Sequence, residues 1–280
     1  MHPQQQLYNH SSLACSKLVT RAYSTSFSKG IRCLARPLRD PVYAIYGFVR
    51  FADEIVDTFE AVDRTQLLNR FRQDTWLALE ERISLNPILH AFQETVHRYQ
   101  IPRAYIEAFL HSMEMDLSYT RFNQQEYETY IYGSAEVVGL MCLCVFCEGD
   151  PRRYEPLVPS ARALGSAFQK INFLRDLKAD WEERGRVYFP GVEFSLFSEA
   201  DKQAIEADLA ADFREGAAGI AQLPTGARLG VDLAYRYYLR LFNKIRHLSA
   251  RRLTQGRVRV SDSRKFSIFL TTYWQHARSR

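Results

Sequence analysis

Apolar residues recur at spacings of three and four along almost the whole chain, which is the period of amphipathic α-helices. Signals for strands, such as Asn-Gly hairpin turns or alternating runs of Val, Ile and Thr, are nearly absent. Only 13 glycines and 10 prolines interrupt the 280 residues, so long helices are easily accommodated. The sequence therefore predicts an all-α protein.

The predicted helices are separated by breaks at proline and glycine that are short enough to be turns between packed helices. No linker, low-complexity segment or solenoid-length repeat divides the chain, which favours one helical domain over residues 1–280 around a central cavity or core. Roughly the first fifteen residues and the extreme C-terminus are expected to be peripheral. The predicted helices are 7–23, 41–59, 64–83, 87–99, 102–117, 124–147, 154–181, 201–222, 227–253 and 261–276, with breaks at 39–41, 86–87, 101–102, 149–151, 185, 190–191 and 224–226.

The formal net charge of +5 arises in the C-terminal thirty residues. Residues 251–280 contain eight basic residues and a single acidic one, Asp262, so the rest of the chain is slightly acidic. A nucleic acid is therefore not an expected partner, because nucleic-acid binding usually needs a basic body or stripe.

The N-terminal segment MHPQQQLYNHSS lacks the basic and apolar regions of a signal peptide, so we expect a cytoplasmic protein. The longest apolar run, 137–147, has about 11 residues, whereas a bilayer-spanning helix needs about 20, so no transmembrane helix is predicted. The five cysteines are an odd number and include a CxCxxC pattern at Cys142, Cys144 and Cys147. Since no second Cys or His cluster completes a metal site, we interpret these three as reduced core thiols.

A polar stripe marks the segment PVYAIYGFVRFADEIVDTF. Tyr46, Arg50, Asp53 and Asp57 are spaced by 4, 3 and 4 residues, so they share one face of a helix whose neighbouring positions are apolar. The segment LGSAFQKINFLRDLKADWEERGRVYFP repeats this arrangement. Its stripe has the same spacings and consists of Gln169, Asn172, Asp176 and Asp180.

Carboxylates that converge between apolar helices lose hydration and repel one another unless cations neutralise them. Mg²⁺ prefers oxygen ligands and commonly combines one or two carboxylates with phosphate oxygens, so two facing aspartate pairs indicate Mg²⁺ and a diphosphate. Arg50 and Arg175, each close to an Asp, can bind the remaining phosphate oxygens. The alternative is that each motif is a solvated helix face, with Arg50 and Asp53 in an intrahelical ion pair. The matched spacing of two stripes favours the metal-diphosphate site.

At these residues the sequence resembles the squalene/phytoene synthase family, whose members join two isoprenyl diphosphates head to head. The resemblance runs in family order from about residue 20 to 260 and implies an isoprenoid synthase helical bundle around a central cavity. The matching segments are Tyr23-Ser24-Thr25-Ser26-Phe27, GFVRFADEIVD, Met113-Glu114-Met115-Asp116-Leu117, the helix from Tyr132-Gly133 to Gly139, and QKINFLRDLKADWEERGRVYFP.

The resemblance assigns metal and substrate roles to the two stripes. It implies that Mg²⁺, or alternatively Mn²⁺, is coordinated by Asp53, Asp57, Asn172, Asp176 and Asp180, and that no nicotinamide cofactor takes part. The residues implied to hold the two diphosphates are Tyr23, Ser24, Ser26, Tyr46, Arg50, Gln169 and Arg175.

The same resemblance implies which residues surround the reacting carbons. Metal and arginine would stabilise the diphosphate that leaves as the allylic C–O bond ionises. Aromatic faces would stabilise the resulting carbocation, which must be kept from water. The residues implied are Phe27 and Tyr132 at the reacting centre, Tyr238 in the cavity, Arg257 at a diphosphate, and Arg186, Val187 and Tyr188 in a flap over the site.

Two acidic residues depart from the family pattern. Glu54 stands where the family often has a second Asp, but it points about 100° away from Asp53 on a helix, so we expect the metal site to be unaffected. Glu136 follows Tyr132 by one turn, in a stretch where the family usually has small residues. It either enters the cavity or pairs with a nearby Arg, and we interpret it as a buried, paired carboxylate.

The resemblance leads us to expect a Mg²⁺-dependent prenyltransferase of carotenoid biosynthesis. It would condense two geranylgeranyl diphosphates to phytoene through a cyclopropylcarbinyl intermediate, prephytoene diphosphate, and release two diphosphates. The alternatives are a squalene or dehydrosqualene synthase that uses two farnesyl diphosphates, and a noncatalytic relative that acts as an assembly or binding protein. The lack of a nicotinamide motif and of a C-terminal anchor favours phytoene, and the four retained aspartates favour an enzyme.

The apolar tails of these substrates suggest peripheral contact with a membrane. The basic C-terminal thirty residues could meet anionic lipid headgroups, although arginines on a terminal helix can also form an ordinary solvated face. The choice between C20 and C15 substrates depends on the depth of the cavity, which residue spacing does not reveal. The oligomeric state is likewise not visible in the sequence.

Overall fold

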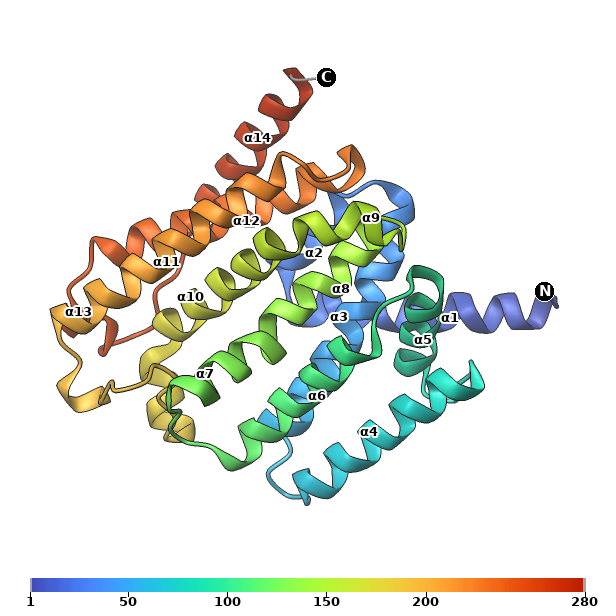
Figure 1. Cartoon of the computed structure of the whole chain (residues 1–280), viewed down its shortest axis with the longest axis horizontal. Coiled ribbons are helices and arrows are strands. Elements are labelled where there is room, and N and C mark those ends of the chain that lie inside the picture. Colours follow the sequence, from blue (N-terminus) through green and yellow to red (C-terminus); the bar gives the residue numbers. More distant parts are fainter. Residues whose placement is uncertain (1, 279–280) are drawn as a thin grey trace.

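The structure, a computed structural model, describes residues 2–278 apart from the side chains of Thr25, Ser26, Asp262, Ser263, Lys265, Phe266, Ala277 and Arg278. Over these residues the chain is helical, and its one pairing of extended residues is an isolated bridge between Arg121 and Val187. The helices pack into one bundle (Figure 1), which confirms the all-α prediction.

The longer helices agree with most of the predicted spans. They are α1 (Pro3–Tyr23), α2 (Thr25–Arg32), α3 (Arg36–Asp57), α4 (Arg64–Glu81), α5 (Pro87–Tyr99), α6 (Arg103–Ser118), α7 (Gln124–Ile131), α8 (Val137–Phe146), α10 (Val158–Arg184), α11 (Glu199–Ile220), α12 (Thr225–Arg246) and α14 (Asp262–Arg278). Short elements join them: η1 (Tyr132–Glu136), α9 (Pro151–Tyr154), η2 (Glu155–Leu157), η3 (Phe194–Leu196) and α13 (Ala250–Leu253).

The predicted break at 39–41 is wrong. α3 begins at Arg36 and continues through Pro41. Pro41 has no N–H, so the helix loses the hydrogen bond to the carbonyl of Pro37. Leu38 and Pro41 are both buried, and this packing holds the helix together across the missing bond. The first aspartate helix is therefore longer at its N-terminus than the sequence pattern indicated.

Three other boundaries also differ from the prediction. The segment Thr25–Arg32 forms α2, which was not predicted; the Ser24 hydroxyl caps it by accepting a hydrogen bond from the Phe27 N–H at 3.2 Å. The helix expected at 227–253 is divided into α12 and α13, and the one expected at 154–181 begins later, as α10. α10 runs to Arg184 and ends at Gly185, whose φ of 63° gives a left-handed cap.

The apolar helix predicted over 124–147 contains a π-helical turn, η1, between α7 and α8. At this turn the backbone of Gly133 approaches α6, so that a Cβ on Gly133 would lie 2.4 Å from the carbonyl oxygen of Ala108. Glycine is required for this approach, and the extra residue of a π turn changes which side chains of the following helix face inward.

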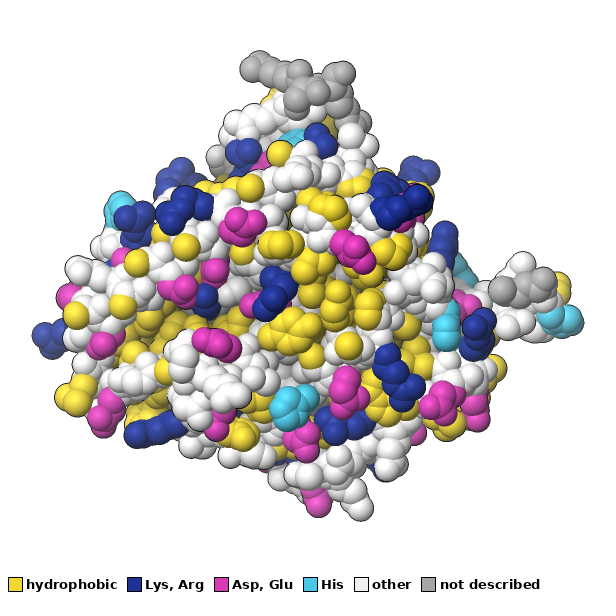
Figure 2. Space-filling view, in the orientation of Figure 1, with side chains coloured by type: hydrophobic (Ala, Val, Ile, Leu, Met, Phe, Trp, Pro, Cys, Tyr) yellow, Lys and Arg dark blue, Asp and Glu magenta, His cyan; other side chains and the backbone are white. Residues whose placement is uncertain are grey.

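The core consists of two groups of buried side chains. The first joins α3, α5, α6 and α8, where the ring of Phe48 stacks on that of Phe92 with centroids 3.9 Å apart. The second joins α10 to α12 and to the segment after α10 and includes Phe173 and Tyr188, stacked at 4.0 Å. On the face shown in Figure 2, acidic and basic side chains are interspersed, which agrees with a body that has no strong charge of one sign.

One helical stretch among the described residues, Gln124–Phe146, is long and apolar enough to cross a membrane by composition alone. Half of its most apolar window is buried inside the protein. Val137, Met141 and Val145 are fully buried and belong to the first core group. The stretch therefore has the contacts of a core helix, as expected for the apolar run.

Candidate active site

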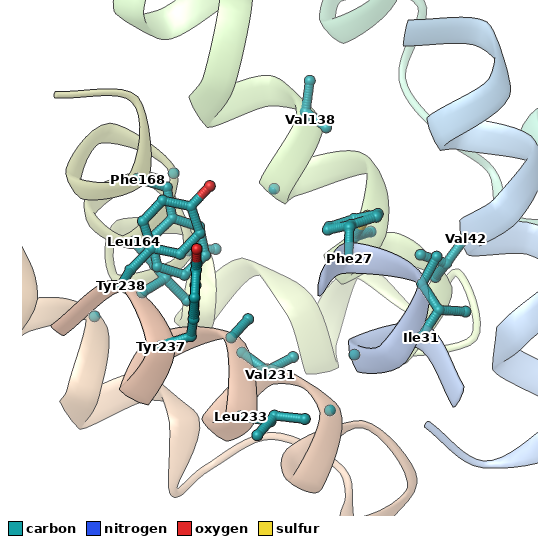
Figure 3. Close-up of a pocket in the computed structure, with 18 of the residues that line it drawn as sticks. Phe27, Ile31, Val42, Val138, Leu164, Phe168, Val231, Leu233, Tyr237 and Tyr238 are labelled. Atoms are coloured by element: carbon teal, nitrogen blue, oxygen red, sulfur yellow. The ribbon is translucent and has the colours of Figure 1, made fainter. Parts of the chain in front are cut away.

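A cavity of about 510 Å³ lies between the two aspartate-bearing helices, α3 and α10, and the neighbouring helices α2, α8, α11 and α12. Its wall is mostly apolar. In Figure 3, Phe27 and Val42 lie on one side, and Phe168 and Tyr238 lie on the other. This volume lies within the range of small-molecule sites, and apolar walls suit a hydrocarbon tail.

Polar side chains are concentrated at one end of the cavity, around Gln169 on α10. The Gln169 amide donates to the Ser134 hydroxyl at 3.3 Å and accepts from the Asn172 amide at 3.4 Å. The Tyr238 hydroxyl donates to Asn172 Oδ1 at 3.4 Å. Burial raises the pKa of Tyr238, so this phenol stays protonated and remains a donor. These hydrogen bonds connect α10, η1 and α12 at one end of the cavity.

Beyond this end, the stripe on α3 forms ion pairs. The Arg50 guanidinium contacts Asp53 Oδ2 at 2.5 Å and also pairs with Glu54, and it lies 4.3 Å from the centre of the Tyr23 ring. The buried Nε–H of Arg50 has no hydrogen-bond partner among the described residues. An unpaired cationic donor of this kind can be satisfied by an anion such as a phosphate oxygen.

The stripe on α10 is paired with arginines in the same way. Arg175 contacts Asp176 Oδ2 at 2.5 Å, and Arg257 reaches Asp176 Oδ1 at 2.7 Å. Arg184 connects the two helices, because its guanidinium lies 3.2 Å from both Asp57 on α3 and Asp180 on α10. The two stripes therefore face each other.

The carboxylates of the two stripes are buried close to one another, so a nearby cation would stabilise their charged forms. Burial, together with neighbouring Asp57, raises the pKa of Asp53 to about 6, although Arg50 opposes the shift. Burial and neighbouring Asp176 likewise raise the pKa of Asp180 to about 6. α3 ends at Asp57, and helix C-termini carry partial negative charge. Two helix ends with several carboxylates thus create a site that favours positive charge.

The donor chemistry of this region suits a divalent cation. Asp53, Asp57, Asn172, Asp176 and Asp180 supply only oxygen ligands, which Mg²⁺ prefers. Within the described part of the chain, no three acidic, His or Cys side chains are grouped closely enough to hold a metal by themselves. This is consistent with the arginine pairs, which occupy the carboxylates, and with a metal that takes further ligands from phosphate and water.

The segment after α10 is fixed by a buried polar cluster. Arg186 lies 3.1 Å from Asp116 Oδ1 and donates to the Asp116 carbonyl, while Tyr130 donates to Asp116 Oδ2 at 2.9 Å. Tyr188 donates to Asp116 Oδ1 at 3.4 Å. Burial raises the pKa of Asp116 to about 7, and Arg186 and the Tyr130 hydroxyl act against this shift. Arg186 also lies 3.6 Å from Asp57, so the cluster adjoins the aspartate region.

The family model of squalene/phytoene synthase matches residues 20–264. The chain belongs to the squalene/phytoene synthase family. The match covers both stripes, the segment after α10 and all of the cavity wall except Ile268 and Phe269. Members of this family are prenyltransferases that bind isoprenyl diphosphates, and an apolar cavity with a charged end has the chemistry that suits such a substrate.

Relatives within the squalene/phytoene synthase family have several products. The chain is 26% identical over 294 aligned positions to the 15-cis-phytoene synthase of a Paracoccus species, covering 96% of this chain and 92% of the relative. It is 30% identical over 172 positions to the presqualene diphosphate synthase of Rhodopseudomonas palustris, covering 60% and 59%. It is 26% identical over 200 positions to the 4,4'-diapophytoene synthase of Staphylococcus haemolyticus, covering 69% and 67%.

Solved structures share the squalene/phytoene synthase fold. A crystal structure of a dehydrosqualene synthase in complex with a ligand superposes with a TM-score of 0.83 at 22% identity and covers 98% of this chain and 99% of its own. The squalene synthase from Alicyclobacillus acidocaldarius gives a TM-score of 0.76 at 19% identity, with coverage of 90% and 97%. The isoprenoid synthase bundle expected from the sequence is confirmed.

Many residues predicted for the family site lie around one region. The cavity wall contains Ser24, Phe27, Tyr46, Gln169, Arg175 and Tyr238. Tyr23, Arg50, Arg257 and the acidic stripes lie next to it in the ion pairs described above. The prediction for Ser26 falls on a side chain outside the described residues. The three free cysteines of the CxCxxC pattern are in the core, and Cys142 also lines the cavity.

Tyr132 is placed differently from the expectation, and the segment after it in the predicted site, residues 186–188, is buried. Tyr132 does not line the cavity; its ring lies 5.1 Å from the Arg162 guanidinium, and the π turn directs Ser134 and Ala135 inward instead. Arg186, Val187 and Tyr188, which were expected in a flap over the site, are buried, and Arg186 pairs with Asp116 and lies 3.6 Å from Asp57. Val187 is held by its N–H, which donates to the Thr120 carbonyl at 3.1 Å.

Glu136 and Glu54 have clear partners. Glu136 pairs with Arg162 at 2.6 Å and is nearly buried, as interpreted from the sequence, and burial raises its pKa. Glu54 pairs with Arg50, the same guanidinium that contacts Asp53. Glu54 therefore shares its arginine partner with Asp53. This link was not predicted from the sequence, because the Glu54 side chain points about 100° away from Asp53 on the helix.

Two important residues were not assigned roles from the sequence. Arg184 lies four residues after Asp180 and so continues the second stripe, which was a signal for its position. Asp116 was part of a matching segment, but its partners Arg186 and Tyr188 lie about seventy positions away. Only the fold reveals that these residues meet.

Proposed function

We propose that this protein condenses two geranylgeranyl diphosphates head to head to phytoene, through prephytoene diphosphate, and requires Mg²⁺. The observation that carries the proposal is the facing pair of aspartate stripes, linked by arginines, at the polar end of an apolar cavity. The apolar wall would hold the tails, and the charged end would hold the diphosphates. This arrangement would place the apolar tail and the charged diphosphate of each substrate in different parts of the site.

The diphosphates would bind at the charged end of the cavity, where arginines and metal-binding carboxylates lie together. The unpaired Nε–H of Arg50 would donate to one phosphate oxygen, and Arg175 would bind another after exchanging its contact with Asp176. Asp53, Asp57, Asn172, Asp176 and Asp180 would hold Mg²⁺. When bound, the metal stabilises the negative charge that develops on a departing diphosphate.

The cavity wall would protect and stabilise the carbocation. Phe27 stacks on Tyr46 with ring centroids 4.9 Å apart, and Phe168 stacks on Tyr238 at 4.0 Å. These two aromatic pairs lie on opposite sides of the cavity in Figure 3, and an aromatic face stabilises a desolvated cation by about 2 kcal/mol. Each of the two condensation steps releases one diphosphate and one proton, so the reaction balances without a redox cofactor.

The relatives named phytoene synthase support the choice of a C20 substrate. The wall of the cavity follows α10 from Ser160 to Arg175, a rise of about 22 Å. This span, which includes the diphosphate end at Arg175, is comparable with the length of an extended isoprenyl diphosphate.

The experiment that tests the proposal is incubation of the purified protein with Mg²⁺ and either geranylgeranyl or farnesyl diphosphate, followed by analysis of the hydrocarbons. We expect a C40 product, phytoene, from geranylgeranyl diphosphate and none when Mg²⁺ is chelated. A C30 product from farnesyl diphosphate, with geranylgeranyl diphosphate inert, would instead identify a dehydrosqualene or squalene synthase. No product from either substrate would contradict the enzymatic function.

A further inference from the structure

The π turn η1 packs against two helices through its backbone. A Cβ on Gly133 would lie 2.4 Å from the carbonyl oxygen of Ala108 on α6. On the other side, a Cβ on Gly165 of α10 would lie 2.8 Å from the carbonyl oxygen of Ala135 in the turn. A side chain larger than hydrogen fits at neither position without a shift of the backbone. These contacts bring η1 close to both helices, but they are not directional bonds that would fix its orientation.

An ion pair on the outer side of the turn joins it to α10. Arg162 Nε donates to the Glu136 carboxylate at 2.6 Å. The Glu136 side chain is only 12% exposed, so little water screens its attraction to the guanidinium. The same guanidinium lies 5.1 Å from the centre of the Tyr132 ring. Tyr132 and Glu136 are the first and last residues of η1, so Arg162 contacts both ends of the turn.

The inner side of the turn faces the cavity. Ser134 and Ala135 belong to the cavity wall, and the Ser134 hydroxyl accepts a hydrogen bond from Gln169 Nε2 at 3.3 Å. Gln169 Oε1 then accepts one from Asn172 Nδ2 at 3.4 Å. Because Asn172 uses its amide nitrogen here, its Oδ1 is directed elsewhere, toward the Tyr238 hydroxyl at 3.4 Å. The position of Ser134 therefore determines which atom Asn172 has available for a cation.

We propose that Glu136 and Arg162 are positioning residues for the polar end of the cavity. Their ion pair holds the π turn, and the turn places Ser134 where it orients the amides of Gln169 and Asn172. This inference rests on the proposed function, in which Asn172 holds Mg²⁺ at a diphosphate. Glu136 and Arg162 are outside the cavity wall, so they act through the turn and not by touching a substrate.

Binding of inorganic diphosphate in the presence of Mg²⁺, measured by calorimetric titration of the full chain, tests the proposal without turnover. Glu136→Ala and Arg162→Met each break the ion pair, and each should raise the Kd about fivefold, the effect of losing about one well-aligned hydrogen bond. The matched control is Glu148→Ala, which breaks an exposed pair with Arg153 at 3.0 Å and should bind like the unmodified chain. Unchanged Kd values in both ion-pair variants would overturn the proposal alone. An unmodified chain that binds no diphosphate would remove the proposed function and this inference with it.

Further variants separate positioning from a general loss of packing. Arg162→Lys keeps a cation beside Glu136 and should bind diphosphate within about twofold of the unmodified chain. Ser134→Ala removes the hydroxyl through which the turn acts on Gln169, so it should weaken binding about fivefold as well. Adding Glu136→Ala to Ser134→Ala should then cause no further loss, because both act on one contact. Additive losses in this double variant, or an Arg162→Lys variant as weak as Arg162→Met, would overturn the proposal.

Hydrogen exchange of the chain in EDTA follows the turn itself. In Glu136→Ala the backbone amides of residues 132–137 should exchange faster than in the unmodified chain, because the turn has lost its link to α10. The same amides should exchange at the unmodified rate in Glu148→Ala, and circular dichroism should show equal helicity in both variants. Weaker diphosphate binding without faster exchange at 132–137 would show that Glu136 acts through its charge and not by holding the turn, which would contradict the positioning role.

Discussion

Arg184 and Asp57 are the last residues of their helices, and their side chains lie 3.2 Å apart. Because Arg184 also contacts Asp180 at 3.2 Å, one guanidinium holds together the C-terminal ends of α3 and α10. Both helix ends carry partial negative charge in addition to their carboxylates. A cation at this position therefore stabilises the fold of the site, and a metal bound to the same aspartates would replace part of that stabilisation.

The substitution Arg184→Gln should destabilise the protein in the absence of divalent metal. Loss of a partly exposed cation shared by two carboxylates should lower the free energy of unfolding by about 1 kcal/mol, or the Tm by about 2–4 °C. Addition of Mg²⁺ should raise the Tm of this variant more than that of the unmodified chain. The matched control is Lys178→Gln on the same helix, whose exposed pair with Glu182 at 3.5 Å should matter little. Identical Tm values for both variants in EDTA would contradict the structural role of Arg184.

The aspartate stripes are predicted to be essential for turnover. The double variant Asp53→Asn and Asp176→Asn keeps the size of both side chains but removes two of the charges that would bind metal. We expect hydrocarbon formation to fall by about a thousandfold or more, because stabilisation of the leaving diphosphate is lost. Circular dichroism should show unchanged helicity. Asp74→Asn, on the exposed face of α4, is the control and should be fully active. Full activity of the double variant would remove the proposed metal site.

Periodicity predicted the part of the site that lies along single helices. The spacings of Asp53 to Asp57 and of Asp176 to Asp180 are local properties, and they were sufficient to predict two polar faces. The pairing of Asp116 with Arg186 is a contact between distant segments, so no local pattern contains it. Tyr132 was misplaced because a π turn is a response to close packing at Gly133, which periodicity does not show. The helix through Pro41 was missed for a similar reason, since buried neighbours outweighed a local breaker.

The apolar end of the cavity should determine the length of the substrate. Ala161 lines the cavity on α10, almost four turns before Arg175. The substitution Ala161→Phe adds a ring at the far end, where a C20 tail would reach and a C15 tail would not. We expect activity with geranylgeranyl diphosphate to fall about tenfold or more relative to activity with farnesyl diphosphate. Ala211→Phe, exposed on α11, is the control and should leave this ratio unchanged. Equal losses with the two substrates would argue against length selection at Ala161.

His90 should make the folded protein less stable in mild acid. It is buried, accepts a hydrogen bond from the Ser84 N–H at 3.3 Å, and its Nε2 lies 3.0 Å from Asn9 Oδ1. Burial lowers the pKa of His90 below the usual value for histidine of about 6.5. As pH falls below 6.5, the unfolded chain therefore binds a proton before the folded one does, and stability decreases until the pH passes the lower folded value.

Urea unfolding at pH 7.5 and pH 5 measures this effect of His90. The drop in the free energy of unfolding between the two pH values should be smaller in His90→Gln than in the unmodified chain. His10→Gln, at an exposed position of α1, is the control and should show the same drop as the unmodified chain. A drop in His90→Gln as large as in the control would show that His90 does not contribute to the pH dependence.

The buried pair of Asp116 and Arg186 should be costly to break and less costly to replace. Asp116→Leu leaves the Arg186 guanidinium in the interior with only the more distant Asp57, at 3.6 Å, and should destabilise the protein by about 3–5 kcal/mol. The double variant Asp116→Leu and Arg186→Met removes both charges and should be more stable than Asp116→Leu alone, since no unpaired ion is left behind. Glu80→Leu, which breaks an exposed pair with Arg103 at 3.9 Å, should cost about 1 kcal/mol or less. If the double variant unfolds at a lower urea concentration than Asp116→Leu, the stabilisation comes from the hydrogen bonds of Arg186 to other groups rather than from neutralisation of Asp116.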